Sequence, residues 1–189
     1  RGSVWVKYSE LKTIETDRLI LRKFVNGDLA DLYAYGKLDT VGPKAGWMPH
    51  PSLEHSQKIL NHFIAGNDVY ALYLKSENKV IGSVGLHQTK LGEYGEVYEL
   101  GYVLSTFYEG KGYMFEAVKA VLDYAFKELN LDRIYVGHFL ENDRSKNLIN
   151  KFNFQYLNDY DYESRDYGIK RSKIYCMTKE DYNKSGGLK

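Results

Sequence analysis

A lysine between two glycines stands at the start of a long amphipathic run in the stretch "YEGKGYMFEAVKAVLDYAFKEL", residues 108–129. Glycine lets the backbone turn sharply and lets a ligand come close to backbone N–H groups. The first turn of a helix has unpaired N–H groups and about half a positive charge, and Lys111 adds a cation. A simple strand-to-helix turn would also explain Gly110 and Gly112. Strand, glycine-rich turn and helix start together predict a phosphate cradle.

Two common phosphate cradles are missing from the chain. It contains no GxxxxGK[ST] motif, and no GxGxxG motif after an early strand with an acidic residue about 20 positions on. A nucleoside triphosphate or a dinucleotide redox cofactor is therefore not the expected ligand.

A second candidate segment is "NDRSKNLINKFNF", residues 142–154. Asn142 and Ser145 stand three residues apart at the expected start of a helix, just beyond a strand. Taken alone, Asn142 or Asp143 is an N-cap and Ser145 belongs to the first turn. Taken with the Gly-Lys-Gly loop, the same pair could face a ligand.

The elements that must position these residues follow from hydrophobic periodicity and turn residues. Helix 112–129 carries one apolar stripe at steps of three and four, so it can lie on a sheet. The loop 42–51 holds all three prolines, and the final "SGGLK" is expected to be loose. Strands are expected at 14–25, 69–75, 79–87, 96–104, 132–140, 154–164 and 168–178, and further helices after Asp28, at 52–66 and at 143–152. This order predicts a mixed sheet with helices on both faces.

Composition favours one globular domain over residues 1–189, with a core at about 14–178. The chain is 43% apolar and 27% charged, and its net charge is +1. That balance argues against binding nucleic acid through bulk charge. No apolar run reaches the roughly 20 residues that a membrane helix needs. With Cys176 as the one cysteine, no internal disulfide can form, and we expect a cytoplasmic setting.

Three stretches resemble the GNAT acetyltransferases, in particular the branch of the ribosomal-protein N-terminal acetyltransferases. "TDRLILRKF" resembles the opening strand of that branch, and "VYELGYVLSTFYEGKGYMFEAV" resembles its acetyl-coenzyme A motif. "NDRSKNLINKFNF" is similar to its NxxSxxLxEKxGF segment. The resemblance runs from about Thr16 to Thr178. It implies an α+β fold with a mixed, mostly antiparallel sheet that is flanked by helices and splayed between the fourth and fifth strands.

The resemblance also implies acetyl-coenzyme A as the co-substrate and no metal. Loop N–H groups would hold the pyrophosphate, and the strand ending at Leu104 would pair with pantetheine through its free backbone groups. A backbone N–H near Val103 could polarise the thioester carbonyl. The implied binding residues are Val103, Leu104, Glu109, Gly110, Lys111, Gly112, Tyr113, Met114, Asn142 and Ser145.

The chain departs from the family pattern at several positions. Glu109 replaces a tryptophan or basic residue and puts a negative charge near the phosphates unless its side chain points away. Met114 replaces a small residue, and Asn150 replaces a glutamate. Ile149 stands where many members have a tyrosine general acid, so that role is vacant or filled by Ser145 or a bound water.

Acetyl transfer to an amine needs a proton acceptor, because an aliphatic amine with a pKa near 10 is mostly charged at neutral pH. Glu99 is the candidate base, since apolar neighbours on its strand could raise its pKa. An exposed glutamate or one paired with an arginine is the alternative. Trp47 and His50 lie in the region that borders the acceptor groove in this branch, and they contact substrate or simply pack.

The remaining chemistry-bearing residues suggest no other site. His50, His55 and His62 have no usual metal-ligand spacing, and Cys176 is expected to be buried without a covalent role. We therefore predict an acetyl-CoA-dependent N-acetyltransferase, monomeric or homodimeric, that acts on a protein or peptide N-terminal amine. A polyamine or other small amine is the alternative acceptor. A coenzyme A-binding module without catalysis is the second hypothesis, and an RNA-binding domain lacks a basic stripe.

Overall fold

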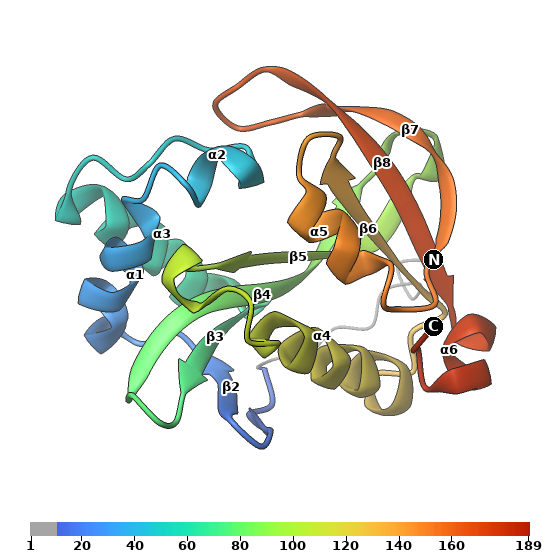
Figure 1. Cartoon of the computed structure of the whole chain (residues 1–189), viewed down its shortest axis with the longest axis horizontal. Coiled ribbons are helices and arrows are strands. Elements are labelled where there is room, and N and C mark those ends of the chain that lie inside the picture. Colours follow the sequence, from blue (N-terminus) through green and yellow to red (C-terminus); the bar gives the residue numbers. More distant parts are fainter. Residues whose placement is uncertain (1–10) are drawn as a thin grey trace.

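The computed structural model describes residues 11–189, and its centre is one eight-stranded sheet in the order β1-β2-β3-β4-β5-β6-β8-β7 (Figure 1). Every neighbouring pair is antiparallel except β5 and β6, which are parallel. The predicted mixed, mostly antiparallel sheet is therefore confirmed. The strands are β1 (Ile14–Glu15), β2 (Leu19–Lys23), β3 (Val69–Leu74), β4 (Lys79–Lys90), β5 (Glu96–Leu104), β6 (Arg133–Phe139), β7 (Gln155–Glu163) and β8 (Ile169–Thr178).

Helices cover both faces of the sheet, as predicted. The helix α4 (Tyr113–Asp123) packs its apolar stripe on one face, where Val118, Val121 and Leu122 are almost fully buried. On the opposite face, α1 (Leu29–Gly36) and α3 (Leu53–Gly66) enclose a separate cluster around Leu32 and Leu60. Two short helices, α5 (Asp143–Ile149) and α6 (Lys179–Ser185), lie beside the strands of the C-terminal half (Figure 1).

The sheet opens between β5 and β6. These strands share a register of only two residue pairs, Glu99 with Tyr135 and Leu100 with Val136. Beyond Leu100, β5 keeps its partner β4, while β6 continues beside β8 as far as Phe139. The segment 101–104 thus has a strand on one side only. The splay was predicted between the fourth and fifth expected strands, residues 96–104 and 132–140, which correspond to β5 and β6. This prediction is confirmed.

Two helices were missed by sequence reasoning. The helix α2 (Gly42–Ala45) lies inside the predicted loop, with a proline in its first turn and Gly46 in the left-handed conformation at its end. The helix α6 begins with a capping box between Thr178 and Asp181. The expectation of a loose tail is wrong, because the Lys189 amide donates to the Lys151 carbonyl at 3.1 Å.

Candidate active site

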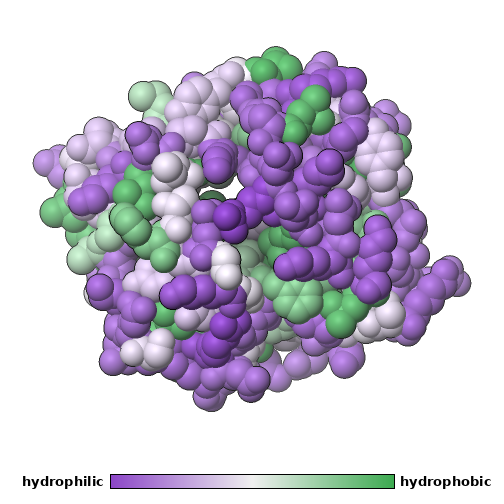
Figure 2. Space-filling view, viewed as in Figure 1, coloured by the Kyte–Doolittle hydropathy of each residue, from purple (hydrophilic) through white to green (hydrophobic). Residues whose placement is uncertain are grey.

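A cavity of about 1180 Å³ opens where β5 leaves β6, between α2 on one side and α5 on the other. Figure 2 shows this face of the molecule hollowed at the same place. Lys111 does not line the cavity; its side chain is exposed. The predicted site residues that do line it are Trp47, His50, Glu99, Val103, Leu104, Glu109, Gly110, Gly112, Tyr113, Met114, Asn142 and Ser145.

Free backbone amides surround the start of α4. Gly110 and Gly112 have φ angles of 82° and 80°, which are strained for any other residue. The first backbone bond of the helix runs from the Glu116 amide to the Gly112 carbonyl at 3.0 Å. The hydrogen bonds of residues 11–189 include none donated by the amides from Gly110 to Phe115. Converging, unpaired N–H groups at a helix start are what an anion needs, so this loop can hold a diphosphate.

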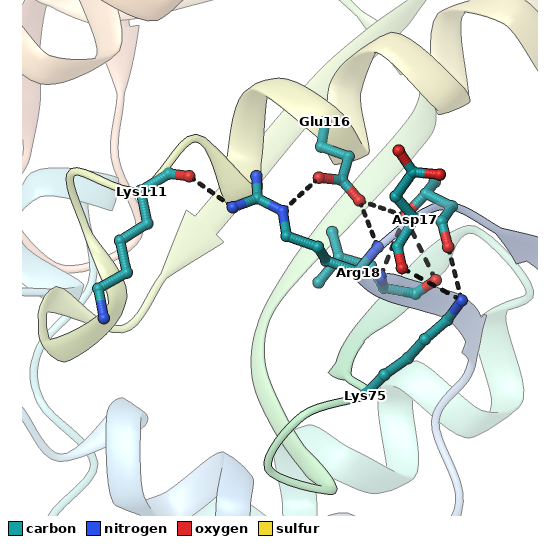
Figure 3. A network of polar contacts seen from close by, with 7 residues as sticks. Asp17, Arg18, Lys75, Lys111 and Glu116 are labelled. Carbon is teal, nitrogen blue, oxygen red and sulfur yellow. Dashed lines mark hydrogen bonds and ion pairs between the residues drawn. The ribbon is translucent and has the colours of Figure 1, made fainter.

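An ion-pair network fixes this loop to the beginning of β2 (Figure 3). The Arg18 guanidinium donates from Nε to Glu116 at 2.7 Å and from Nη1 to the Lys111 carbonyl at 2.8 Å. It also lies over the Tyr113 ring, 4.4 Å from the ring centroid. Thr16 Oγ1 donates to the other Glu116 oxygen at 2.6 Å. Arg18 and Glu116 stand in separate stretches of the sequence, 98 positions apart, so neither stretch predicts this contact.

The Glu116 carboxylate gives the network a definite pH dependence. Burial works to raise its pKa, but hydrogen bonds from Thr16 and Arg18 outweigh this, and the pKa lies below its usual value. A carboxyl group with a lowered folded-state pKa stabilises the fold above its unfolded pKa, and this stability is lost as the pH falls through the folded value. We expect Glu116→Gln to lower the free energy of unfolding by about 1 kcal/mol at neutral pH, a modest figure because solvent screens the half-exposed Arg18.

Thermal denaturation of wild type and Glu116→Gln between neutral and acid pH checks this. The difference in Tm should be largest at neutral pH and should close as the wild-type carboxylate is protonated. Glu163→Gln, which removes an exposed carboxylate of β7, is the control and should show no such trend. A Tm difference that is the same at every pH would contradict the assignment.

The open edge of β5 leads from the loop into the cavity. Val103 and Leu104 are paired with Ser83 and Gly82 of β4. A side chain at position 82 would lie 2.2 Å from the Val103 carbonyl oxygen, so only glycine allows this approach. The opposite edge of 101–104 has no neighbouring strand in the described sheet. An extended amide-bearing chain could add to it as a further strand.

Two hydroxyl groups meet at the start of α5. Asn142 caps the helix, with its Oδ1 accepting from the Ser145 amide at 3.2 Å. Ser145 Oγ lies 2.6 Å from the hydroxyl of Tyr102 on β5. Burial, only partly opposed by the bond to Ser145, raises the pKa of Tyr102, so this phenol stays protonated and can donate. Tyr102 was missed because its partner is 43 positions away in the sequence.

Glu99 lies on the other face of β5 from Tyr102, as strand alternation requires. Desolvation by burial raises the pKa of its carboxyl group, and the nearby His87 partly offsets the rise. A carboxylate with a raised pKa beside an open strand edge can accept a proton near neutral pH. The cavity therefore has a candidate proton acceptor and a candidate proton donor on opposite faces of one strand.

The structure shows the surroundings of two residues that differ from the family pattern, Glu109 and Ile149. Glu109 forms an ion pair with Arg144 at 3.3 Å, so its charge is offset beside the loop. Ile149 is 2% exposed and belongs to the main core, so it cannot supply a polar group to the cavity. The hydroxyl groups of Tyr102 and Ser145 are therefore the candidate proton donors on neighbouring elements.

His50 has a structural contact that the sequence did not reveal. Its Nδ1 lies 2.7 Å from the Ser56 hydroxyl, and its ring lies 5.1 Å from the ring of Trp47. Burial, with the nearby His55 and Arg165, lowers its pKa to about 4, so the imidazole is neutral at physiological pH. His50 ties the loop before α3 to that helix. Contact with the acceptor remains a prediction for both His50 and Trp47.

The tip of the β7–β8 hairpin closes one side of the cavity. The Asp166 amide donates to the Gly46 carbonyl at 3.0 Å, and the Asp166 carboxylate accepts from the Met48 amide at 2.8 Å. A side chain at Gly46 would meet Ser164 and Phe139 at 3.0 and 3.1 Å. The hairpin therefore rests directly on the segment that follows α2.

Two further observations concern the whole described chain. No helix in residues 11–189 is long and apolar enough to span a membrane. Within the same residues, no group of three or more His, Cys, Asp or Glu side chains is placed to hold a metal ion.

Comparison with known proteins gives consistent matches. Residues 18–155 match the model of the acetyltransferase (GNAT) domain. A protein described as "Uncharacterized N-acetyltransferase p20" from Bacillus licheniformis is 30% identical over 162 residues, which is 80% of this chain and 88% of that protein. The [ribosomal protein uS5]-alanine N-acetyltransferase of Escherichia coli is 28% identical over 163 residues, 78% of this chain and 81% of the relative.

The fold has close counterparts among solved structures. The crystal structure of a GNAT-family acetyltransferase from Bacillus anthracis superposes with a TM-score of 0.78 and 26% identity, and the match covers 89% of this chain and 99% of that one.

Proposed function

The chain belongs to the GNAT acetyltransferases, and we propose that it transfers the acetyl group of acetyl-CoA to the N-terminal amine of a peptide or protein. The observation that carries this proposal is the juxtaposition, in one cavity, of the unpaired amides before α4, the open edge of β5 and the Glu99 carboxylate. We assign the whole chain to a single acetyltransferase domain with its core at 14–178.

Successive parts of the cavity fit successive parts of the co-substrate, from its pyrophosphate to its thioester. The amides from Gly110 to Phe115 would hold the pyrophosphate, and the edge of 101–104 would pair with the amides of pantetheine. When bound, acetyl-CoA supplies an activated acetyl thioester. A backbone N–H near Val103 would polarise its carbonyl.

Two side chains would handle the protons. An ammonium group must lose a proton before it can attack, and Glu99 would accept it directly or through a water. The departing thiolate needs a proton, and the Ser145 hydroxyl would donate it while taking one from Tyr102 Oη, which would in turn take a proton from water that enters the cavity as the products leave. Glu99 and the Tyr102–Ser145 pair lie on opposite faces of β5, so a proton does not pass directly from the donor to the acceptor.

A peptide acceptor is favoured by the relative from Escherichia coli, whose name describes alanine acetylation of ribosomal protein uS5. The test is a screen that measures thiol release from acetyl-CoA with N-terminal peptides, polyamines and other small primary amines. Turnover with peptides in preference to small amines supports the proposal. Preference for spermidine-like amines would show that the acceptor is a small amine and not a peptide. Binding of acetyl-CoA without turnover would favour the non-catalytic coenzyme A-binding module.

Removing the Tyr102 hydroxyl should slow the reaction. We expect Tyr102→Phe to lower kcat at least about 10-fold, because the Ser145 hydroxyl loses the group that resupplies its proton. Acetyl-CoA affinity should change little, since the aromatic ring remains. The measurement is steady-state thiol release at saturating acetyl-CoA.

Tyr98→Phe is the matched control for this prediction. Tyr98 lies on the same face of β5 and accepts a hydrogen bond from Gln88 at 2.7 Å, but it does not line the cavity. Its variant should keep the wild-type kcat. Equal losses in Tyr98→Phe and Tyr102→Phe would point to strand packing and remove Tyr102 from the reaction.

A further inference from the structure

His87 on β4 lines the cavity but has no role in the proton transfers described above. It is the direct cross-strand partner of Glu99, so the two side chains leave the same face of the sheet. Directly opposite residues of an antiparallel pair have Cβ atoms about 5 Å apart. A proton could therefore pass between the Glu99 carboxyl group and the imidazole directly or through one water.

Asp68 sets the tautomer of the imidazole. Its Oδ2 lies 2.8 Å from His87 Nδ1. A carboxylate can only accept a hydrogen bond, so in the neutral ring Nδ1 carries the proton and Nε2 has a free lone pair. Among residues 11–189, no hydrogen-bond partner is present at Nε2. The ring is therefore held with its basic nitrogen available.

Two glycines determine where Nε2 lies. Gly85 and Gly101 form the next pair along β4 and β5 on the same face, in the direction of Val103. A Cβ atom at Gly85 would lie 2.4 Å from Nε2, and one at Gly101 would lie 3.8 Å from it. The imidazole thus lies over the backbone of Gly85 and Gly101, which have no side chains, beside the open edge of β5. A larger residue at position 85 would displace the ring.

The His87–Asp68 pair also reaches the protein surface. The side chains of His87 and Asp68 are 41% and 38% exposed, whereas Glu99 is largely desolvated. A proton accepted by Glu99 has to leave before the next turnover. The imidazole, directly across the strand pair from Glu99, is a candidate route from the desolvated carboxylate to solvent.

We propose that His87, oriented by Asp68, takes the proton of the acceptor amine from Glu99 and releases it to solvent. In the first step an N–H bond of the ammonium breaks and an O–H bond forms on Glu99. In the second step that O–H bond breaks and an N–H bond forms at Nε2. The imidazolium, stabilised by the Asp68 carboxylate, then gives a proton to water. This inference rests on the proposed function.

The two carboxylates near the imidazole come from different segments of the chain. Asp68, in the segment before β3, lies at Nδ1, and Glu99 of β5 lies directly across the strand pair.

Chemical rescue tests the proposal. We expect His87→Ala to lower kcat by about 10- to 100-fold. Added imidazole should restore part of the rate in proportion to its neutral form, because the half-exposed site is open to solvent. His87→Gln, which keeps a side chain of similar size, should show a similar loss without rescue. Asp68→Asn should also lower kcat, because it removes the carboxylate that holds the proton on Nδ1, and acetyl-CoA affinity should be unchanged in all three variants.

His62→Ala, which removes an exposed histidine of α3 outside the cavity, is the control. Its kcat should equal that of the wild type, and added imidazole should not change it. Wild-type kcat and pH dependence in both His87 variants would overturn the inference while leaving the acetyltransferase assignment intact. A loss in His87→Ala that imidazole does not reverse would make His87 structural and would also overturn it. Failure of the wild type to acetylate any amine would overturn the proposed acceptor as well.

Discussion

Glu99→Gln should lower kcat by about 10²- to 10⁴-fold and leave acetyl-CoA affinity unchanged. Glutamine keeps the size of the side chain and its capacity to accept a hydrogen bond, but it cannot take a proton. Thiol release at saturating amine measures the loss, and calorimetric titration with acetyl-CoA measures the affinity. Glu96→Gln is the matched control, because Glu96 is an exposed glutamate at the beginning of the same strand.

The same substitution should make the protein more stable. Burial raises the folded-state pKa of Glu99 above its unfolded value, so the carboxyl group favours the fold at low pH and this contribution is lost as the pH rises through the folded pKa. Glutamine is uncharged, so it avoids the unfavourable burial of a charged carboxylate at neutral pH. The Tm of Glu99→Gln should therefore exceed that of the wild type at neutral pH and approach it in acid. Wild-type turnover in this variant would exclude Glu99 as the proton acceptor.

Gly112→Ala should weaken acetyl-CoA binding by about 100-fold. A non-glycine residue at a φ of 80° costs about 1–2 kcal/mol, and the loop can escape this strain only by turning its amides away. The loss of two amide–phosphate bonds, at about 1.5 kcal/mol each, corresponds to that factor. Affinity measured by calorimetry and the KM for acetyl-CoA should both change, with a smaller effect on kcat.

Gly168→Ala separates backbone strain from ligand binding. Gly168 of the β7–β8 hairpin has a φ of 67°, and a Cβ there would meet nothing within 4 Å, whereas one at Gly112 would lie 3.4 Å from Arg18 Nη2, an ordinary contact distance. Both alanine variants should lose similar stability, but only Gly112→Ala should lose affinity. Acetyl-pantetheine, which lacks the diphosphate, should react equally well with wild type and Gly112→Ala. An equal loss with both thioesters would show that the loop does not bind the diphosphate.

The parts of the site that sequence predicted are local in the chain. The glycines of the loop and the apolar stripe of α4 are adjacent in sequence, so spacing alone indicated a turn and a helix that packs on the sheet. Apolar neighbours on β5 suggested that Glu99 is desolvated, with an exposed or arginine-paired glutamate as the alternative, and burial does raise the pKa of its carboxyl group. The capping box of α6 was also readable, but the glycine-rich composition after Ser185 suggested a loose end.

The parts that sequence did not predict are contacts between distant segments. Arg18 and Glu116 are 98 positions apart, and Tyr102 and Ser145 are 43 apart. His87 lies opposite Glu99 only through the register of β4 and β5. Such pairs depend on strand register and on how helices pack, and no single stretch of sequence specifies either.

The contact between the β7–β8 hairpin and the segment after α2 has a consequence for kinetics. Among residues 11–189, the β7–β8 hairpin is bonded to the segment after α2 by two hydrogen bonds at Asp166, and Asn142 Nδ2 donates to the Lys44 carbonyl of α2 at 3.4 Å. Each such bond contributes about 1 kcal/mol, so this bridge should open transiently far more often than the sheet unfolds. Deuterium should therefore enter the Met48 and Asp166 amides early, and a bulky acceptor that holds the bridge open should accelerate that uptake.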